Sequence, residues 1–285
     1  MPRPGFAPFD RRTRIILVLA TVAACGMHGF SPAMADEPDP EASVCGALRE
    51  PLAFWAFRHG AGSVQAGRVA GIADIERIVF RTRDGRQLGG YKLRATAPTG
   101  YLLVAQGNAT LADQIAHDMQ YFRRLGVDVY LYDYRGYGLS EGKSRLNAIV
   151  ADYREIAASL NAQPYRRRLL YGMSMGGVIL LNAVGTTGDY TALVIDSSPS
   201  RISRYGCPKI YDPVHQLPPD SSRIMIIGGE RDRVVQIAQV EELMRVAQSR
   251  GARVLRHPDL AHPFMDASAD LYQSRFQAVA DFLAR

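Results

Sequence analysis

Short β-rich runs alternate with helix-length patterns along most of this 285-residue chain. Two β-rich runs, residues 75–82 and 88–95, flank the tight-turn pair Asp84-Gly85 and predict an antiparallel hairpin. Later β-rich runs occupy residues 101–106, 127–132, 168–171, 192–196, 223–227 and 254–257, and helical patterns occupy residues 111–125, 147–160, 176–184, 237–250 and 268–283. Because consecutive parallel strands need a crossover between them, the alternation predicts an α/β fold with a mostly parallel central sheet and helices on both faces.

The N-terminus is typical of an export signal. Residues 1–14 carry four arginines and one aspartate, and the uncharged apolar run 15–24 follows. These are the two leading parts of a secretory signal peptide, and the run is too short for an ordinary membrane span. No other window approaches the roughly 18 consecutive apolar residues that a membrane helix needs, so we expect the rest of the chain to be exported and soluble.

Two processing sites compete. Residues 33–35, Ala-Met-Ala, match an ordinary signal-peptidase site, whereas residues 22–25, Val-Ala-Ala-Cys, resemble a bacterial lipobox in which Cys25 is lipidated. The first predicts a periplasmic or secreted protein, and the second predicts a lipoprotein anchored to the membrane through Cys25. The expected division is a signal peptide over residues 1–35 (1–24 in the lipoprotein alternative), an N-terminal extension or linker over 36–70 and an α/β domain over 71–285.

The basic charge of the chain belongs largely to this leader. The whole sequence has 34 Lys and Arg against 28 Asp and Glu, a formal net charge of +6. Without the leader's four arginines and one aspartate, 30 basic and 27 acidic residues are left, which is a net charge of only +3. The charge therefore gives no reason to expect a nucleic-acid partner, and nothing in the sequence indicates an oligomeric state.

Either cleavage leaves two cysteines, Cys45 and Cys207. In an oxidising compartment two thiols can pair, which would tie the N-terminal extension to the second half of the domain. The alternative is that both are small buried side chains with no bond between them.

Residues 172–176, Gly-Met-Ser-Met-Gly, lie between a strand-like run and a helical run. This strand–turn–helix setting is typical of a nucleophile elbow, whose sharp turn presents a serine at the carboxyl end of the sheet and needs small neighbours. The same five-residue pattern occurs around Ser140, but no helical pattern follows it. We therefore predict Ser174 as the nucleophile and Ser140 as a loop residue.

A nucleophilic serine needs a base, and the base needs a group that orients it. In this topology the order along the chain is serine, acid, histidine. Asp232 follows the strand 223–227 and His262 follows the strand 254–257, so both should lie at the edge of the sheet that carries Ser174.

Each choice has rivals. His257 stands at the end of the last strand and is expected to be a packed residue, and Glu230 is expected to be a solvated loop charge. Asp196, at the end of the preceding strand, is the alternative to Asp232, because a carboxylate there could also reach the imidazole.

An oxyanion hole needs two backbone N–H groups, one after the nucleophile and one in the loop after the third strand. Met175 follows Ser174, and Asn108 is the matching residue in the loop 106–109, Gln-Gly-Asn-Ala. Gly107 would let the backbone approach a substrate. The alternative is that this loop is a simple turn.

The run 133–144, Asp-Tyr-Arg-Gly-Tyr-Gly-Leu-Ser-Glu-Gly-Lys-Ser, resembles the segment after the fourth strand in the α/β-hydrolase superfamily. The resemblance is to the serine-hydrolase branch with the Bem46-like, monoglyceride-lipase-like and serine-aminopeptidase-like proteins, and it covers residue 75 to the C-terminus. It implies an α/β-hydrolase fold. In that branch the loop after the third strand usually begins with His-Gly-Asn, and Gln106 replaces the histidine here.

The expected activity is hydrolysis of a small acyl ester or thioester by Ser174, Asp232 and His262, with serine-aminopeptidase activity and a non-catalytic binding protein as alternatives. The histidines and cysteines have no metal-ligand spacing and no glycine-rich dinucleotide motif follows a strand, so no metal or cofactor is expected. Lids in this fold usually enter after the sixth strand. Residues 197–222 contain five prolines there, which predicts a minimal cap and an open, shallow site.

Overall fold

The computed structural model describes residues 39–285. The predicted signal peptide, both processing sites, Cys25 and the first residues of the predicted linker lie outside the described residues. The described residues belong to one compact unit.

The core of this unit is an eight-stranded sheet in the order β1-β2-β4-β3-β5-β6-β7-β8. Its strands are β1 (Ile75–Arg81), β2 (Gln87–Leu93), β3 (Gly100–Ala105), β4 (Val127–Tyr132), β5 (Arg167–Met173), β6 (Ala192–Asp196), β7 (Ile224–Gly229) and β8 (Arg253–His257). The pairs β1–β2 and β2–β4 are antiparallel, and every later pairing is parallel. The predicted mostly parallel sheet with an antiparallel start is confirmed.

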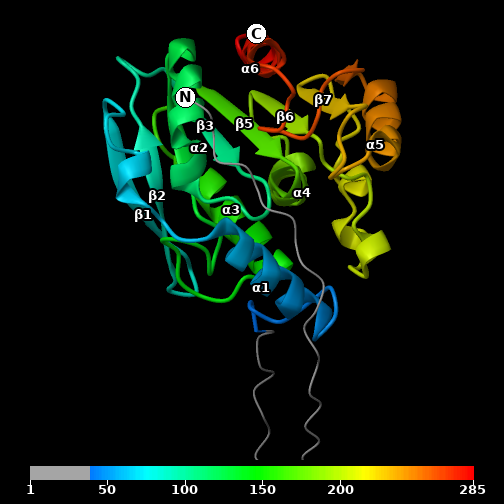
Figure 1. Cartoon of the computed structure of the whole chain (residues 1–285), viewed down its shortest axis with the longest axis horizontal. Helices are drawn as coiled ribbons and strands as arrows, with labels where there is room; N and C mark the ends of the chain where they lie inside the picture. Colours follow the sequence, from blue (N-terminus) through cyan, green and yellow to red (C-terminus); the bar gives the residue numbers. More distant parts are fainter. Residues whose placement is uncertain (1–38) are drawn as a thin grey trace, which may run out of the picture. The chain divides into compact units, whose positions relative to one another are not determined.

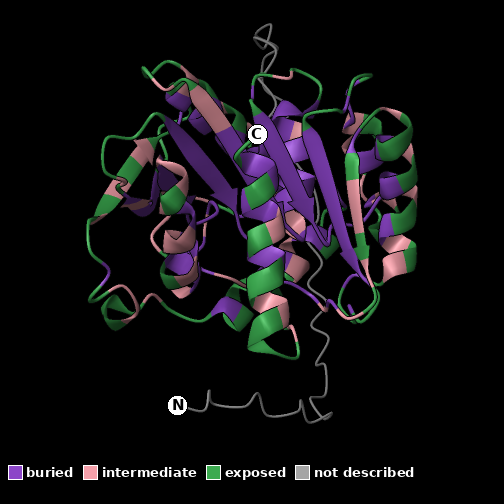
Figure 2. Cartoon of the chain, turned by 90° about the horizontal axis from the view of Figure 1, so that it is seen from above, coloured by how far each residue is buried: buried purple, intermediate pink, exposed green. Residues whose placement is uncertain are grey.

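Helices cover both faces of the sheet (Figure 1). One face packs against α2 (Ala112–Met119), its continuation η2 (Gln120–Leu125) and α6 (Ala269–Leu283). The other packs against α3 (Leu146–Asn161), α4 (Met175–Leu180), its continuation η3 (Leu181–Gly185) and α5 (Ile237–Ser249). The central strands are therefore buried on both sides, as Figure 2 shows, whereas the edge strands β1 and β8 are partly exposed.

Side chains of one central strand enter two separate cores. Leu102 and Val104 of β3 belong to the cluster under α2 and α6, while Tyr101 and Leu103 belong to the cluster under α3, α4 and α5. This follows from the two-residue period of a strand. It also explains why β3 is a continuous apolar run in the sequence and shows no alternation.

The N-terminal extension packs onto the unit. Helix α1 (Arg49–Ala61) buries Phe54 in the core, and the buried Glu50 carboxylate accepts the backbone N–H groups of Cys45 and Leu146 at 2.7 and 2.6 Å. The short helix η1 (Ala66–Arg68) leads on to β1. The extension is thus attached to the rest of the unit by the buried carboxylate of Glu50, one of whose partners lies 96 residues away in the sequence.

Cys45 and Cys207 form a disulfide with an S–S distance of 2.03 Å. Of the two alternatives that the sequence left open, the structure has the bonded one. The bond joins the extension to the segment after β6, across 162 residues of chain.

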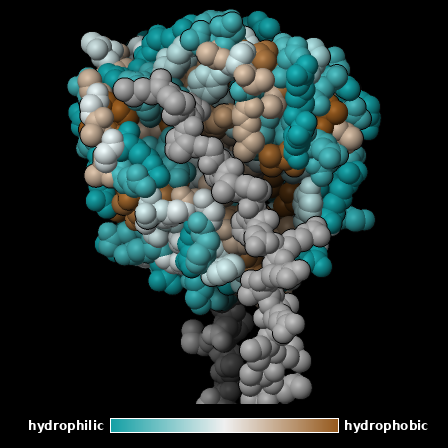
Figure 3. All heavy atoms as spheres, viewed as in Figure 1, coloured by the Kyte–Doolittle hydropathy of each residue, from teal (hydrophilic) through white to brown (hydrophobic). Residues whose placement is uncertain are grey.

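The segment 197–222 holds only three short 3-10 helices, η4 (Ser203–Tyr205), η5 (Lys209–Tyr211) and η6 (Pro213–Gln216). The predicted minimal cap is confirmed. Hydrophobic residues reach the face shown in Figure 3 in scattered patches between hydrophilic ones. Within residues 39–285, no helix combines the length and the apolar character needed to span a bilayer.

Candidate active site

Ser174 sits in the turn between β5 and α4 with φ 53° and ψ −118°, a conformation that side-chain-bearing residues rarely adopt. The turn is possible because its flanking residues are glycines. A Cβ on Gly172 would lie 2.7 Å from the carbonyl oxygen of Gly176, and one on Gly176 would overlap the carbonyl oxygen of Ala105. The sequence pattern around Ser174 therefore produces the strained strand-to-helix turn that was expected from it.

His262 and Asp232 form a direct pair. Nδ1 of His262 lies 2.7 Å from Oδ2 of Asp232. The other carboxylate oxygen, Oδ1, accepts the backbone N–H groups of Val234 and Val235, both at 2.8 Å. When Nδ1 carries the proton and donates it to Asp232, Nε2 is left as an acceptor, which is the tautomer that a general base requires.

The electrostatics of the pair favour an ionised Asp232. Burial disfavours the carboxylate and on its own would raise the pKa of Asp232. The hydrogen bond and charge of His262, together with the N–H groups of Val235 and Val234, outweigh burial and hold this pKa below its ordinary value. Asp232 is therefore a carboxylate at neutral pH and can stabilise a cationic imidazole.

The strand order brings the three loops to one edge of the sheet. Ser174 follows β5, Asp232 follows β7 and His262 follows β8, and β5, β6, β7 and β8 are parallel neighbours. All three side chains are buried. Neighbouring strands are about 4.8 Å apart, so loops that lie 58 and 88 residues from Ser174 in the sequence meet at the same edge.

The structure assigns the rival acids to other partners. The Asp196 carboxylate, fully buried, accepts hydrogen bonds from Arg275 Nη1 at 2.7 Å and from the Tyr171 hydroxyl at 3.0 Å. The exposed Glu230 is ion-paired with Arg256 at 2.8 Å. Neither carboxylate is bound to His262.

The rival histidine and serine also have local roles. His257 ends β8, and its Nδ1 accepts the backbone N–H of Asp259 at 3.1 Å. The Ser140 hydroxyl donates to the carbonyl of Asp133 at 2.6 Å and accepts the N–H of Gly89 at 3.1 Å. Ser140 therefore ties its loop to β2, as a loop residue does.

The loop after β3 lies directly beside the elbow. A Cβ on Gly107 would stand 3.6 Å from the Cβ of Ser174. The next side chain, Asn108, accepts hydrogen bonds through Oδ1 from the Tyr137 hydroxyl at 2.9 Å and from the N–H of Ala109 at 3.1 Å. Met175 is the first residue of α4, where a helix leaves N–H groups without an intrahelical partner. Met175 thus follows Ser174 directly, and the loop that carries Asn108 approaches Ser174 at Gly107.

Gln106, which replaces the histidine of the resembling branch, anchors the start of this loop. Its side chain is fully buried and donates through Nε2 to the carbonyl of Tyr132 at 2.8 Å. Its own carbonyl accepts the Tyr134 hydroxyl. Its Oε1 is buried and has no hydrogen-bond partner in the described part of the chain. The glutamine therefore joins the ends of β3 and β4, which keeps the loop attached beside Ser174.

Sequence reasoning missed a buried charge network behind the His262 loop. Arg275 on α6 donates to the carbonyl of Ala261 at 2.6 Å, and Asp266 accepts the N–H of the same residue at 2.8 Å. Arg275 is also paired with Asp266 and Asp196. A charged residue in an amphipathic helix pattern is usually solvated, so no signal in a single sequence distinguishes Arg275 from the exposed arginines.

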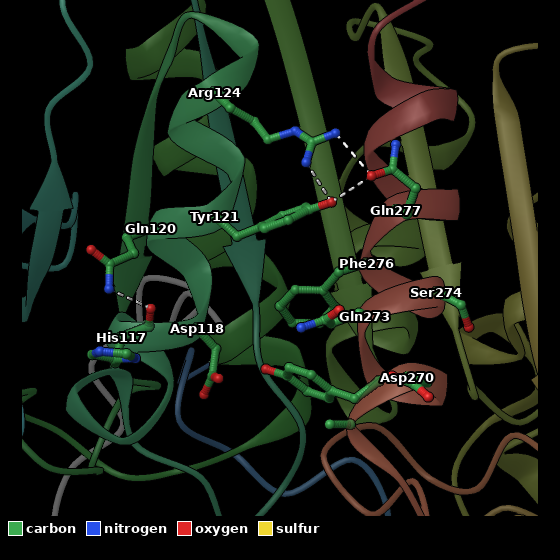
Figure 4. Close-up of a pocket in the computed structure, with 12 residues that line it drawn as sticks. His117, Asp118, Gln120, Tyr121, Arg124, Asp270, Gln273, Ser274, Phe276 and Gln277 are labelled. Atoms are coloured by element: carbon green, nitrogen blue, oxygen red, sulfur yellow. Dashed lines mark hydrogen bonds between the residues drawn. The ribbon is translucent and has the colours of Figure 1, made fainter.

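A hollow of about 820 Å³ lies elsewhere, between η2 and α6 (Figure 4). Its polar groups largely satisfy one another: Arg124 donates to the Tyr121 hydroxyl at 2.7 Å and to Gln277 at 3.0 Å, and the Tyr121 hydroxyl donates to Gln277 at 2.9 Å. Ser174, Asp232 and His262 do not line this hollow. Within residues 39–285, no group of three or more acidic, histidine or cysteine side chains is arranged to hold a metal ion.

Known proteins with similar sequences include a lipase. Residues 96–217 match the family model described as serine aminopeptidase, S33. The chain is 34% identical over 106 residues to a monoacylglycerol lipase of Mycolicibacterium smegmatis, a match that spans 35% of this chain and only 38% of that lipase. It is 25% identical over 240 residues to the Bem46 protein of Schizosaccharomyces pombe, covering 74% of this chain and 77% of that protein.

Solved structures share the fold. An esterase from Pyrococcus furiosus superposes with a TM-score of 0.62 at 15% identity, covering 73% of this chain and 91% of the esterase. A protein from Xanthomonas campestris, described as a serine hydrolase without a lid, superposes with a TM-score of 0.54 at 16% identity, covering 74% of this chain and 92% of that protein. The chain therefore has the α/β-hydrolase fold, and its sequence is similar to hydrolases of the lipase and aminopeptidase types.

Proposed function

We propose that this protein is an exported serine hydrolase that cleaves an ester or thioester through an acyl-enzyme intermediate. Ser174 is the nucleophile, His262 the general base and acid, and Asp232 the group that orients His262. The observation that carries the proposal is the His262–Asp232 pair, with its 2.7 Å contact, on the same sheet edge as the strained turn that holds Ser174.

In the first half of the reaction, Nε2 of His262 takes the hydroxyl proton of Ser174 while Oγ forms a bond to the carbonyl carbon of the substrate. The carbonyl oxygen becomes an oxyanion, and the N–H groups of Met175 and Asn108 donate to it. The bond from the carbonyl carbon to the leaving oxygen or sulfur then breaks. The leaving group receives the proton from His262, and the acyl group stays on Ser174.

In the second half, water replaces the leaving group. His262 takes a proton from the water as its oxygen attacks the acyl carbon, and the same N–H groups stabilise the second oxyanion. The bond to Oγ breaks, Ser174 recovers its proton from His262, and the carboxylic acid is released. The net reaction adds water across the ester or thioester bond and yields a carboxylic acid and an alcohol or thiol. The proposed steps need no cofactor.

Two features favour a small acyl substrate or an acyl group exposed on a larger molecule. The segment after β6 has only short 3-10 helices and adds no cap domain that could enclose a long chain. Val234 and Met265, which follow Asp232 and His262, expose apolar side chains beside the pair. These side chains offer an apolar surface to a substrate that binds at the edge of the sheet.

The proposal that the protein is exported depends on the N-terminal sequence alone. The signal peptide is either cleaved before Asp36, which gives a soluble protein, or cleaved before a lipidated Cys25, which gives an anchored one. The N-terminal residue of the mature protein distinguishes them. Edman sequencing that starts at Asp36 supports the soluble form, whereas a blocked, lipid-modified N-terminus at Cys25 supports the anchored form. An uncleaved Met1 after expression in a bacterium with an intact export system contradicts export.

Covalent labelling tests the nucleophile. A fluorophosphonate probe should label the wild-type protein and leave Ser174→Ala unlabelled, and Ser174→Ala should lose hydrolysis of p-nitrophenyl acetate while keeping its thermal unfolding transition. Ser140→Ala is the matched control, because Ser140 lies in the same five-residue pattern. It should label like the wild type. Equal labelling of Ser174→Ala, or no labelling of the folded wild type, contradicts the proposal, and the second result favours the binding-protein alternative.

Serine-aminopeptidase activity is a second candidate because the matching family model carries that description. The two activities separate on amino-acid p-nitroanilides, which release p-nitroaniline, and p-nitrophenyl acyl esters, which release p-nitrophenol. Amino-acid p-nitroanilides hydrolysed faster than p-nitrophenyl esters would favour the peptidase. We expect the reverse, because Asp196, whose carbonyl accepts the Ser174 N–H, has its carboxylate fully buried and paired with Arg275, where it cannot bind a free amino terminus.

A further inference from the structure

Helix α1 exposes an apolar stripe. Leu48, at the N-cap, and Leu52 and Trp55, within the helix, follow each other at spacings of four and three residues, so they lie on one helix face. Their exposed fractions are 78%, 63% and 55%. The opposite face carries Phe54, which packs into the core. The helix is therefore apolar on both faces, although only one of them is covered within the described chain.

A second exposed apolar group lies next to this stripe. Tyr205 and Ile210, around η4 and η5, are both exposed. Their segment is bound to the start of α1 by the disulfide to Cys207 and by a hydrogen bond from Arg49 to the carbonyl of Tyr205 at 3.1 Å. Figure 1 shows α1 and this segment on the same side of the unit. We call the five side chains Leu48, Leu52, Trp55, Tyr205 and Ile210 the apolar patch.

The exposed charges around the apolar patch are basic. Arg49 and Arg58 on α1 and Arg204 and Lys209 beside η4 and η5 are exposed. The acidic residues of the same two segments, Glu50 and Asp212, are buried and bound to other groups. Glu242 of α5 interacts electrostatically with Arg204 and is ion-paired with Arg201 at 2.6 Å. The patch is therefore an apolar surface with a cationic rim.

We propose that the apolar patch binds the surface of a bilayer that contains anionic lipids. Leucine and tryptophan side chains on the outer face of a helix, flanked by basic residues, are the chemistry by which a helix lies in a lipid interface. Anionic headgroups match the rim. The sequence outside the described residues agrees with such a partner, because the apolar run 15–24 and Cys25, the alternative lipidation site, precede Leu48 by about two dozen residues.

The helix that carries three of the patch residues ends beside the candidate active site. Gly60, at the end of α1, approaches the loop after β3, where a Cβ on Gly60 would lie 3.5 Å from the Cβ of Ala109. Docking through α1 would thus bring the β3 loop close to the lipid surface. The proposal does not depend on the reaction, because lipid binding is measured without turnover.

Trp55 is the only tryptophan of the chain, so its fluorescence reports on this helix alone. We expect its emission to shift to shorter wavelength when the full chain is mixed with phosphatidylcholine–phosphatidylglycerol vesicles, and brominated lipids to quench it. Pure phosphatidylcholine vesicles should give a much weaker effect. Leu52→Asp should weaken partitioning about tenfold or more, and Lys209→Glu should weaken it by at least about fivefold on anionic vesicles.

Val79→Asp is the matched control, because Val79 is 57% exposed on the edge strand β1, away from α1. It should bind vesicles like the wild type. Sedimentation with vesicles without any change in Trp55 emission overturns the proposal, since the N-terminal apolar run alone would then bind. A blue-shifted emission that needs no vesicles also overturns it. If that emission depends on protein concentration, a second copy of the chain covers the patch, and if it does not, the chain's own N-terminal segment covers it.

Discussion

The Asp232 carboxylate is surrounded by donors on both oxygens. His262 occupies one oxygen, and the N–H groups of Val234 and Val235 occupy the other. The two backbone donors hold Oδ1 in place, so that Oδ2 faces the imidazole of His262. A side chain at this position therefore sets both the tautomer and the orientation of His262.

Asp232→Asn should lower kcat/KM on p-nitrophenyl acetate by roughly 10⁴-fold. The amide can still accept from the two valine N–H groups, but it cannot stabilise a cationic His262 and it favours the wrong tautomer. Asp259→Asn, which alters a half-exposed carboxylate paired with Arg231, is the control and should stay close to wild type. A loss smaller than tenfold in Asp232→Asn would mean that another group orients His262.

The lowered pKa of Asp232 also predicts how stability depends on pH. The folded-state pKa lies below the unfolded value of about 3.9, so the ionised carboxylate stabilises the fold above that value. This contribution is lost as pH falls through the folded-state pKa. The free energies of unfolding of wild type and Asp232→Asn, measured in urea at pH 7 and pH 2, should therefore differ more at pH 7. A difference that grows at pH 2 would contradict the lowered pKa.

At the scale of elements, α6 stabilises the edge of the sheet through Arg275. Its guanidinium is buried between Asp196, at the end of β6, and Asp266, and it also binds the carbonyl of Ala261. Asp196 in turn accepts the N–H of Ser174 through its own carbonyl at 2.8 Å. One side chain thus links the nucleophile turn to the residue that precedes His262.

Arg275→Met should lower the free energy of unfolding by about 3–5 kcal/mol, because it leaves two buried carboxylates without their cation. Urea denaturation at pH 7 measures the effect, and Gln273→Met, on the exposed face of the same helix, is the control. If Arg275 also positions His262, Arg275→Met should lower kcat more than it raises KM at temperatures where the variant is fully folded. Unchanged kcat in the folded variant would limit Arg275 to a role in stability.

At the scale of the whole molecule, the disulfide closes a loop of most of the domain. Reduction should lower the free energy of unfolding by roughly 2–5 kcal/mol, because the unfolded chain gains the freedom that a cross-link over 162 residues had removed. Urea denaturation with and without dithiothreitol measures this. The double variant Cys45→Ser, Cys207→Ser should show the lower stability in both conditions. A wild-type protein that dithiothreitol does not destabilise, despite complete reduction, would contradict this expectation.

The order and kind of the elements could be predicted because they depend on local patterns. The two-residue and 3.6-residue periods mark strands and helices wherever one face is buried, and the glycines at 172 and 176 mark a turn that larger residues cannot enter. The candidate residues Ser174, Asp232 and His262 followed from the same logic, since each stands just after a strand. Their sequence positions relative to the strands were sufficient to nominate them.

The sequence by itself therefore determined the α/β architecture, the elbow around Ser174 and the short list of acids and histidines. Only the tertiary structure decided that Asp232 contacts His262 while Asp196 binds Arg275, that α1 packs on the domain with one apolar face exposed, and that Cys45 meets Cys207. The physical reason is the sequence separation between the residues that interact. Local patterns arise from neighbours within a few residues, whereas these contacts join residues that are 30, 79 and 162 positions apart and exist only once the sheet has assembled.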